Sequence, residues 1–182
     1  MALLETPVGN LGWCAPDFEL TSADGISHRL GDYAGDRGVL VAFICNHCPY
    51  VKAIIDRLVA DALQLREAGV AVLAVMPNDY TTYPADSPQN MQRFAEQHHF
   101  GFPYLIDEDQ AVARAFGAVC TPDFFGFNKK GELQYRGRID NLEMRSAGKR
   151  DAELLKAMLM IAQTGSASIE QHPSIGCSIK WR

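Results

Sequence analysis

The sequence predicts an α/β fold in which helices flank a central mixed β-sheet. Residues 39–44, VLVAFI, are apolar on both faces, which is typical of a strand in the middle of a covered sheet. From Pro49 the apolar residues follow helical spacing as far as Gly69, and residues 70–75, VAVLAV, form a second buried strand. The order strand, helix, strand predicts a right-handed crossover and a parallel pair of strands.

The other elements are predicted on either side of this unit. Residues 15–30 alternate around a glycine-containing turn, which favours an N-terminal β-hairpin. After a polar loop, Asp86 or Ser87 is expected to cap a helix that has Pro88 at its first position. The later elements are expected as a short strand at 102–107, a short helix ending at 117, a hairpin turning at 129–131 and an amphipathic helix at 150–163.

The length and the composition set the class of protein. A chain of 182 residues is expected to form a single domain, 1–182, with a core at about 8–163 and a tail at 164–182 without strong periodicity. Hydrophobic residues make up 47% and charged residues 21%, as in an ordinary soluble protein. The net charge of −5 and the lack of a long basic run argue against nucleic acid as a partner. No membrane span or signal peptide is recognised, so we expect a cytoplasmic protein.

Cysteine usage narrows the chemistry. The chain has five cysteines, an odd number in varied contexts, whereas a secreted disulfide scaffold would be shorter and richer in cysteine. In a reducing compartment, closely spaced cysteines indicate redox catalysis or metal binding. The two that are close together are Cys45 and Cys48, in the stretch CNHC.

Cys48 is the better candidate for a reactive thiolate. A free thiol has a pKa of about 8.5, and a helix N-terminus lowers it because backbone N–H groups point at the sulfur. Cys48 directly precedes Pro49, which suits the first helical position, whereas Cys45 lies at the end of the strand or in the turn. His47, when protonated, can stabilise the thiolate electrostatically.

Three stretches resemble a known family. The order of elements is the thioredoxin arrangement, and PDFEL, CNHCPYV and GAVCTPDFFGFN resemble the peroxiredoxin-like branch of the alkyl hydroperoxide reductase/thiol-specific antioxidant (AhpC/TSA) superfamily. The resemblance covers about residues 8–163, and the tail PSIGCSIKW is also similar. It implies a thioredoxin-like fold with an N-terminal hairpin and a peroxiredoxin-like insertion at 78–117.

The resemblance also implies roles for single residues. Cys48 stands five residues after the strand residue Phe43, where thioredoxins place the attacking cysteine, and Cys48-Pro49 matches the peroxidatic cysteine and the proline after it. Thr121-Pro122 matches the cis-proline of thioredoxins. Cys45 replaces the peroxiredoxin threonine or serine, and Pro122 replaces the catalytic arginine. These departures favour disulfide exchange over efficient peroxide reduction.

The sequence thus predicts a thiol–disulfide oxidoreductase in which Cys48 attacks and Cys45 resolves, with Cys120 as the alternative resolving thiol. A thiol peroxidase with an antioxidant role is the second hypothesis. No cofactor is expected. The expected partners are a protein or small-molecule disulfide or hydroperoxide and an external dithiol such as a thioredoxin, and a homodimer is left open.

A module that binds a metal or a partner protein is the third hypothesis. Its metal would be held by the two cysteines of CNHC, completed by one of a set of four residues: His47, His98, Cys120 and Cys177. No second C-x-x-C follows in the chain, so the redox interpretation is preferred to the metal site.

Overall fold

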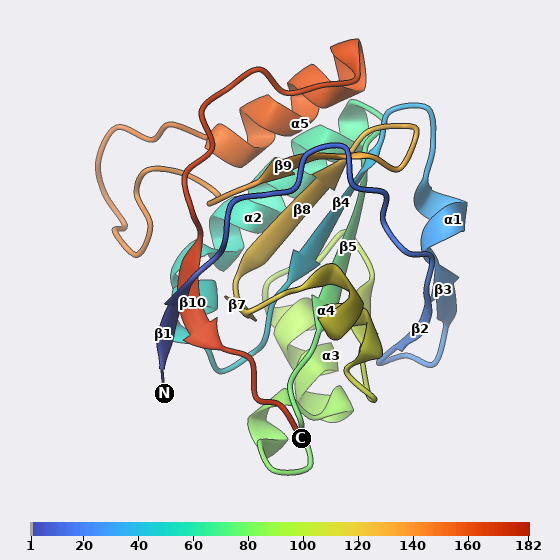
Figure 1. Cartoon of the computed structure of the whole chain (residues 1–182). Coiled ribbons are helices and arrows are strands. Elements are labelled where there is room, and N and C mark those ends of the chain that lie inside the picture. The colour runs from blue at the N-terminus through green and yellow to red at the C-terminus, as the bar shows by residue number, and fades with distance from the viewer. Residues whose placement is uncertain (1) are drawn as a thin grey trace.

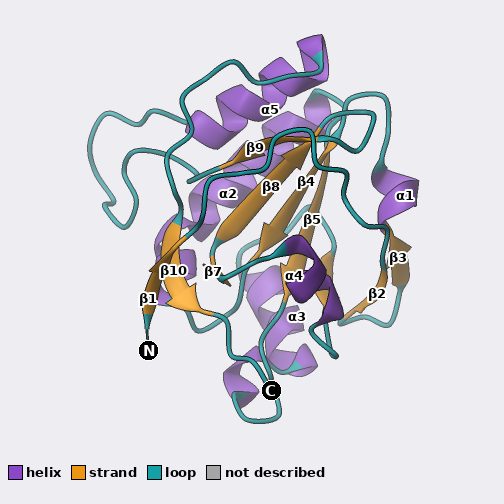
Figure 2. Ribbon diagram, in the orientation of Figure 1, coloured by secondary structure: helices purple, strands orange, loops and turns teal. Residues whose placement is uncertain are grey.

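The computed structural model describes residues 2–182, and within them it has two β-sheets (Figures 1 and 2). The strands are β1 (Leu3–Glu5), β2 (Glu19–Ser22), β3 (Ser27–Arg29), β4 (Val39–Phe43), β5 (Ala71–Met76), β6 (Tyr104–Ile106), β7 (Cys120–Thr121), β8 (Asp123–Phe127), β9 (Leu133–Arg136) and β10 (Ile175–Ser178). The helices are α1 (Leu30–Tyr33), α2 (Pro49–Glu67), α3 (Pro88–Gln97), α4 (Ala111–Phe116) and α5 (Glu153–Thr164). The large sheet has the order β3-β2-β6-β5-β4-β8-β9, and the small sheet has the order β1-β10-β7.

The centre of the large sheet is the predicted strand–helix–strand unit. β4 is buried at every residue and lies between β5, which is parallel to it, and β8, which is antiparallel. β8 and β9 form the predicted antiparallel hairpin. Phe43, the last residue of β4, pairs with Asp123, the first residue of β8. The point where β4 leads toward α2 therefore lies beside the loop that carries Pro122.

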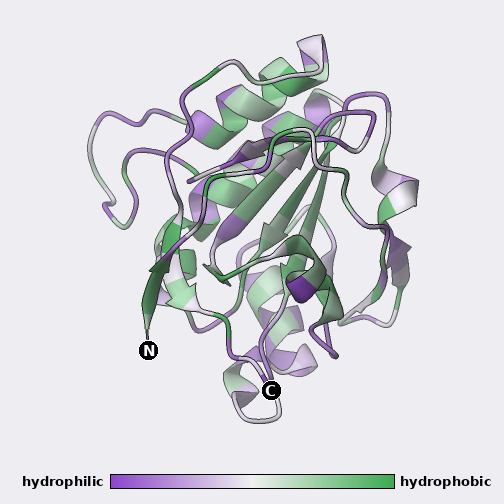
Figure 3. Ribbon diagram, viewed as in Figure 1, coloured by the Kyte–Doolittle hydropathy of each residue, from purple (hydrophilic) through white to green (hydrophobic). Residues whose placement is uncertain are grey.

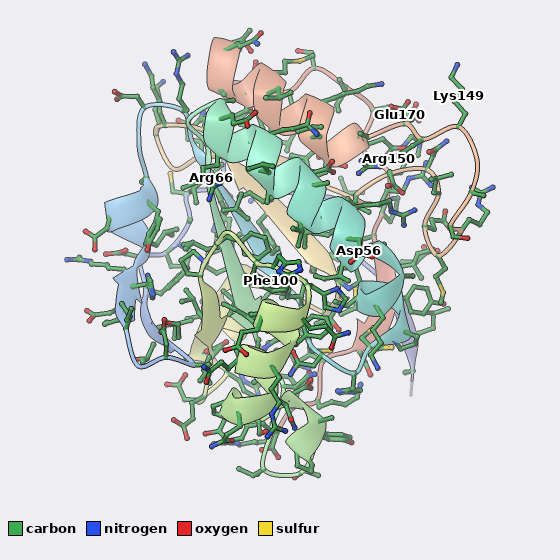
Figure 4. All side chains as sticks on the ribbon, turned by 180° about the vertical axis from the view of Figure 1, so that it is seen from behind. Asp56, Arg66, Phe100, Lys149, Arg150 and Glu170 are labelled. Atoms are coloured by element: carbon green, nitrogen blue, oxygen red, sulfur yellow. The ribbon has the colours of Figure 1, made fainter. Side chains whose placement is uncertain are left out.

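The core has two sides because the side chains of β4 alternate between the faces of the sheet. Leu40 and Ala42 belong to a cluster with residues of α2 and α5, whereas Val41 and Phe43 pack with Phe116 of α4. Figure 4 shows α2 and α5 side by side over one face of the sheet, and Figure 1 shows α4 on the other. The strands between them are mostly hydrophobic (Figure 3). The apolar composition of β4 follows from this double coverage.

The hairpin and the insertion build the far edge of the large sheet. β2 and β3 pair antiparallel, as predicted, and β2 also pairs with β6 of the inserted segment. β6 in turn lies parallel to β5. The predicted helix α3 begins at Pro88, and a short 3-10 helix, Pro84–Asp86, precedes it. The segments added to the thioredoxin arrangement thus extend its sheet.

The C-terminal tail forms a strand that the sequence did not predict. β10 pairs with β1 on one side and with β7 on the other, and Cys177 lies opposite Thr121. α2 also contacts β10. β10 is only four residues long and its apolar and polar residues do not alternate. It forms because it pairs with strands far away in the chain, and a local pattern cannot reveal such partners.

The longest helix, α2, has 19 residues and mixes buried apolar positions with exposed charged ones. Across residues 2–182, none of the helices is both long enough and apolar enough to span a bilayer.

Gly38 provides a test of the contact between β4 and β8. It has a φ of +91°, and a Cβ added to it would lie 2.2 Å from the carbonyl oxygen of Phe127. Gly25 has a similar φ of +85°, but its Cβ would meet nothing within 4 Å. We expect Gly25→Ala to lower the free energy of unfolding by about 1 kcal/mol, the cost of a left-handed alanine. Gly38→Ala should lower it by at least about 2 kcal/mol more, because the backbone must also shift. Urea unfolding of both variants measures the difference, and equal losses would contradict the close approach.

Candidate active site

The CNHC stretch connects the end of β4 to the start of α2. Cys48 is the N-cap residue of α2, and Pro49 is the first helical residue, as the sequence predicts. Cys45 lies three residues earlier, just beyond the end of the strand. The exposed fractions of Cys45 and Cys48 are 1% and 0%, so both sulfurs are closed off from solvent.

Asn46 fixes the turn between the two cysteines. Its backbone N–H donates to Asp86 Oδ1 at 2.8 Å, and its side-chain amide donates to the carbonyl of Ala85 at 3.0 Å. The hydroxyl of Tyr104 donates to Asn46 Oδ1 at 3.0 Å. All three partners come from the inserted segment between β5 and the end of β6, so that segment holds the cysteine turn in place.

Thr121 touches both cysteines. The Thr121-Pro122 peptide bond is cis, as the resemblance implies. The Cys48 thiol donates to the carbonyl oxygen of Thr121 at 3.1 Å, and Cys45 Sγ lies 3.2 Å from Thr121 Oγ1. The structure therefore brings together four of the predicted site residues, Cys45, Cys48, Thr121 and Pro122.

A buried ion pair holds the loop that carries Thr121. Arg136 donates to both carboxylate oxygens of Asp123, at 3.3 and 2.9 Å, and to the carbonyl of Gly117 at 2.8 Å. Burial raises the pKa of Asp123 to about 6, and Arg136 opposes that rise. The guanidinium of Arg136 is thus directed at Asp123 and at the Gly117 carbonyl.

The environment of Cys48 favours the thiolate. A hydrogen bond from the Cys45 thiol is the largest cause lowering the pKa of Cys48 to about 5, and burial acts in the opposite direction. The thiol and the N–H of Cys177 and the N–H of Val51, in the first turn of α2, lower the pKa further. The contact with the Thr121 carbonyl is available only to the protonated thiol. Because the pKa of about 5 lies well below neutral, reduced Cys48 is mostly ionised at pH 7 in spite of that contact.

Cys45 shifts in the opposite direction. The hydrogen bond with Cys48 raises the pKa of Cys45 well above its ordinary value, and burial and the charge of Asp86 raise it further. Thr121 lowers it, but by less. The two thiols thus share one proton, which stays on Cys45.

Asp86 is a site residue that was not predicted as one. Asp86 or Ser87 was expected to cap α3; Ser87 is the N-cap residue, and its side chain makes no capping hydrogen bond. The Asp86 carboxylate is buried instead and accepts hydrogen bonds from the Asn46 N–H and from the Asn78 amide at 2.8 Å. The buried N–H of Asn46 needs a hydrogen-bond acceptor, and the Asp86 carboxylate accepts it instead of capping α3. The only sequence signal for this role is that Asp86 belongs to a polar loop.

His47 contacts Asp86 rather than Cys48. Its Nδ1 lies 2.8 Å from the Asp86 carboxylate, and its ring stacks on Tyr83 with 6.0 Å between centroids. The imidazole is about one-fifth exposed. Asp86 is also the carboxylate whose charge helps to raise the pKa of Cys45.

Cys177 joins the site and the Cys120 side chain turns away from it. Cys45, Cys48 and Cys177 belong to one buried cluster. The Cys120 thiol is directed at the carbonyl of Pro122, 3.7 Å away, and burial raises its pKa. Cys120 was predicted only as the alternative resolving thiol and Cys177 only as a ligand in the metal alternative, because the pairing of β10 with β7 was not predicted.

One group of three residues has metal-ligand character. Within residues 2–182, ligand atoms of Cys45, His47 and Asp86 lie within 4.8 Å of one another. His98, offered by the sequence as a fourth ligand, contacts Asp56 on the exposed side of α2 instead. A metal bound by these three residues would have to replace the contact between His47 and Asp86, and the group contains Cys45 but not Cys48.

Among residues 2–182, neither Cys45 nor Cys48 lines either of two spaces close to the site. A space of 640 Å³ lies between the β2–β3 hairpin and α3, and Phe100 and Tyr104 line it, but it reaches neither cysteine. Beside Pro122 and Tyr50 the free space is 20 Å³, about the size of one water molecule. A substrate disulfide therefore reaches Cys48 only when a covering segment moves.

Known proteins resemble the chain over much of its length. Residues 11–136 match the AhpC/TSA family. The thiol-disulfide oxidoreductase ResA of Geobacillus thermodenitrificans is 31% identical over 131 residues, which are 68% of this chain and 67% of that protein. Peroxiredoxin Bcp of Escherichia coli is 34% identical over 122 residues, 63% of this chain and 69% of that protein. A crystal structure of an uncharacterized conserved protein from Geobacillus kaustophilus is 41% identical, with a TM-score of 0.94, and the match covers 100% of this chain and 97% of that one.

The predicted thioredoxin-like fold is confirmed. Solved structures of thioredoxin-like proteins share the arrangement of the central sheet and its helices, including some with low sequence identity, for which the likeness shows the fold alone.

The hydrogen bond between the two cysteines can be tested by titration. Cys45→Ala removes the donor, whereas Cys45→Ser keeps a donor at the same position. We expect Cys45→Ala to raise the pKa of Cys48 by about one to two units, the worth of a hydrogen bond to a charged group, and Cys45→Ser to raise it less. The ultraviolet absorbance of the thiolate, followed against pH, measures both values. Equal pKa values in the reduced parent and in Cys45→Ala would contradict the assigned cause.

The low pKa of Cys48 also makes stability depend on pH. The folded-state pKa of about 5 lies below the unfolded value of about 8.5, so the thiolate stabilises the fold fully above the unfolded value. This contribution is lost as the pH falls through about 5. We expect the unfolding free energy of the reduced parent to exceed that of Cys48→Ser by a margin that grows as the pH rises from about 5 to about 8.5. Urea unfolding across the range measures the margin, and a constant margin would contradict the shift.

Proposed function

The chain belongs to the AhpC/TSA family, as the sequence resemblance indicated, and from this premise we propose that it catalyses thiol–disulfide exchange through Cys48. It is a thiol-dependent oxidoreductase of thioredoxin-like fold. The single observation that carries the proposal is the position of Cys48 at the N-terminus of α2, with a second thiol, Cys45, hydrogen-bonded to its sulfur.

The reaction begins with the Cys48 thiolate. It attacks one sulfur of a substrate disulfide, so that a bond from Cys48 to that sulfur forms and the other substrate sulfur leaves as a thiolate, which takes up a proton. Cys45 then loses its proton and attacks Cys48 Sγ. The Cys45–Cys48 disulfide forms and the second substrate thiol leaves. Two electrons have passed from the protein thiols to the substrate.

Neighbouring groups prepare the second step. Thr121 Oγ1, at 3.2 Å, keeps Cys45 Sγ oriented toward the site. Cys45 keeps its proton as long as Cys48 is a thiolate. It therefore becomes a nucleophile only after Cys48 has formed the mixed disulfide with the substrate. His47 Nδ1 lies 2.8 Å from Asp86, the carboxylate whose charge opposes ionisation of Cys45.

A thiol peroxidase is the second candidate, because the low pKa of Cys48 and the similarity to peroxiredoxin Bcp both support it. The Cys48 thiolate would attack a hydroperoxide, giving a sulfenic acid and an alcohol, and Cys45 would condense with the sulfenic acid to give the disulfide and water. Disulfide exchange is preferred because Cys45 stands where peroxiredoxins have a threonine or serine, and Pro122 stands where they have the catalytic arginine.

The substrates and the reductant follow from this chemistry. Thiol-dependent oxidoreductases of this family act on thiol or peroxide substrates and need a reductant. We propose a protein disulfide as the substrate and an external dithiol protein, such as a thioredoxin, as the reductant. We also propose a reducing compartment such as the cytoplasm, where the cysteines would return to thiols after each cycle.

The role of Cys48 is tested with its serine variant. We expect Cys48→Ser to lose the reduction of insulin by dithiothreitol down to the uncatalysed rate, because serine is not ionised at neutral pH. Cys14→Ser is the matched control, because Cys14 is an exposed thiol outside the site and its loss should leave the rate unchanged. Exchange activity that survives in Cys48→Ser would overturn the proposal. Fast stopped-flow oxidation of the reduced parent by hydrogen peroxide would favour the peroxidase instead.

A further inference from the structure

Cys177 lies on the strand that closes the active site. β10 pairs with β7, and Cys177 is directly opposite Thr121. Side chains of directly opposed residues in an antiparallel pair lie on the same face of the sheet, with about 5 Å between their Cβ atoms. The Thr121 side chain faces Cys45 Sγ at 3.2 Å, so Cys177 is on the cysteine side of the small sheet.

The backbone of β10 is pressed against the same carbonyl that Cys48 contacts. A Cβ added to Gly176 would lie 2.0 Å from the Thr121 oxygen, which shows how closely the strand approaches. The Cys48 thiol donates to that oxygen at 3.1 Å. β10 and the start of α2 therefore meet across Thr121, and both the thiol and the N–H of Cys177 are hydrogen-bond donors to Cys48.

Cys120 provides the contrast within the same strand pair. It precedes Thr121 and is opposite Ser178, so its side chain points to the other face of the small sheet. Its sulfur does not belong to the cluster that holds Cys45, Cys48 and Cys177. The pairing register thus selects Cys177, and not Cys120, as the third thiol of the site.

We propose that Cys177 is a second resolving thiol, which forms a disulfide with Cys48 in competition with Cys45. This inference rests on the proposed function, because it needs Cys48 to form a mixed disulfide. In the step itself the Cys177 thiol loses its proton and attacks Cys48 Sγ. The Cys48–Cys177 bond forms, the bond from Cys48 to the substrate breaks, and the substrate sulfur leaves as a thiolate and is protonated. A dithiol reductant restores the two thiols and is itself oxidised to a disulfide.

The charges around the two resolving thiols favour Cys177. Burial is the largest cause raising the pKa of Cys177 to about 11, and the interaction with Cys48 raises it further, whereas Lys180 lowers it. Cys45 is raised by Cys48, by burial and by the carboxylate of Asp86. In the mixed disulfide Cys48 carries no charge, so its effect on both thiols is gone. Cys45 then still has to ionise beside a carboxylate, and Cys177 ionises near an ammonium group.

The two disulfides can exchange within the protein. Once the Cys48–Cys177 bond has formed, Cys45 is free to attack Cys48, which forms the Cys45–Cys48 bond and releases Cys177 as a thiolate. No electrons leave the protein in this exchange. The position of the disulfide then decides whether β10 is covalently tied to the start of α2.

The test counts the thiols released from an aryl disulfide, dithiobis(nitrobenzoate). Its coloured thiolate is released once when Cys48 attacks and once more when a resolving thiol displaces the adduct. All variants carry Cys14→Ser, which removes the exposed thiol. They are Cys45→Ser, Cys177→Ser, their double variant and Cys48→Ser, with Cys177→Ala and circular dichroism as checks on folding.

We expect Cys45→Ser to release both equivalents, the second within about threefold of the parent rate, and peptide mapping to find the Cys48–Cys177 disulfide. The double variant should stop after one equivalent, with the second released at least about a hundredfold more slowly. A stable adduct in Cys45→Ser alone, with Cys177 unmodified, would overturn the role of Cys177 and leave the proposed function intact. A fast first release from Cys48→Ser would overturn the proposed function itself.

Discussion

The constraint on which the site depends is a negative charge held on a buried sulfur. Cys48 has no exposed surface, yet its pKa is lowered to about 5, so hydrogen-bond donors must replace the water that the thiolate lacks. The donors come from its own helix, from Cys45 in the preceding turn and from Cys177 in β10. The end of β4, the start of α2 and the pairing of β10 with β7 all have to be in place for that charge to be stable.

The segments added to the thioredoxin arrangement are therefore parts of the site. The inserted stretch between β5 and β6 supplies Asp86, which binds the Asn46 N–H and the His47 ring. The tail supplies β10 and with it Cys177. One addition places a carboxylate beside Cys45, and the other places a third thiol beside Cys48. The hydrogen bond between Cys45 and Cys48 is the largest cause that separates their pKa values, and Asp86 and Cys177 widen the separation.

The elements with strong periodicity could be predicted from the local sequence pattern alone. α2, α5, β4, β5 and both hairpins were predicted from apolar spacing and turn residues, and the N-cap position of Cys48 followed from Pro49. The strands of the small sheet were missed because they have two to four residues and are stabilised by partners far away in the chain. Asp86 and Cys177 were missed for the same reason. What each side chain does is decided by a pairing that no short window of sequence contains.

The low pKa of Cys48 has opposite effects on the two halves of a catalytic cycle. Stabilising the thiolate favours the reduced protein, by about 1.4 kcal/mol for each unit of pKa, so regeneration by a dithiol is favourable. The same stabilisation reduces the intrinsic nucleophilicity of the sulfur. Attack on Cys48 by the resolving thiol is also slow when that thiol holds its proton, as Cys45 does beside Asp86. The rate of this attack then depends on how close the resolving thiol is held to Cys48 Sγ. Cys177 is held close to that sulfur by β10, and within residues 2–182 it has no counterpart of the Asp86 carboxylate beside it.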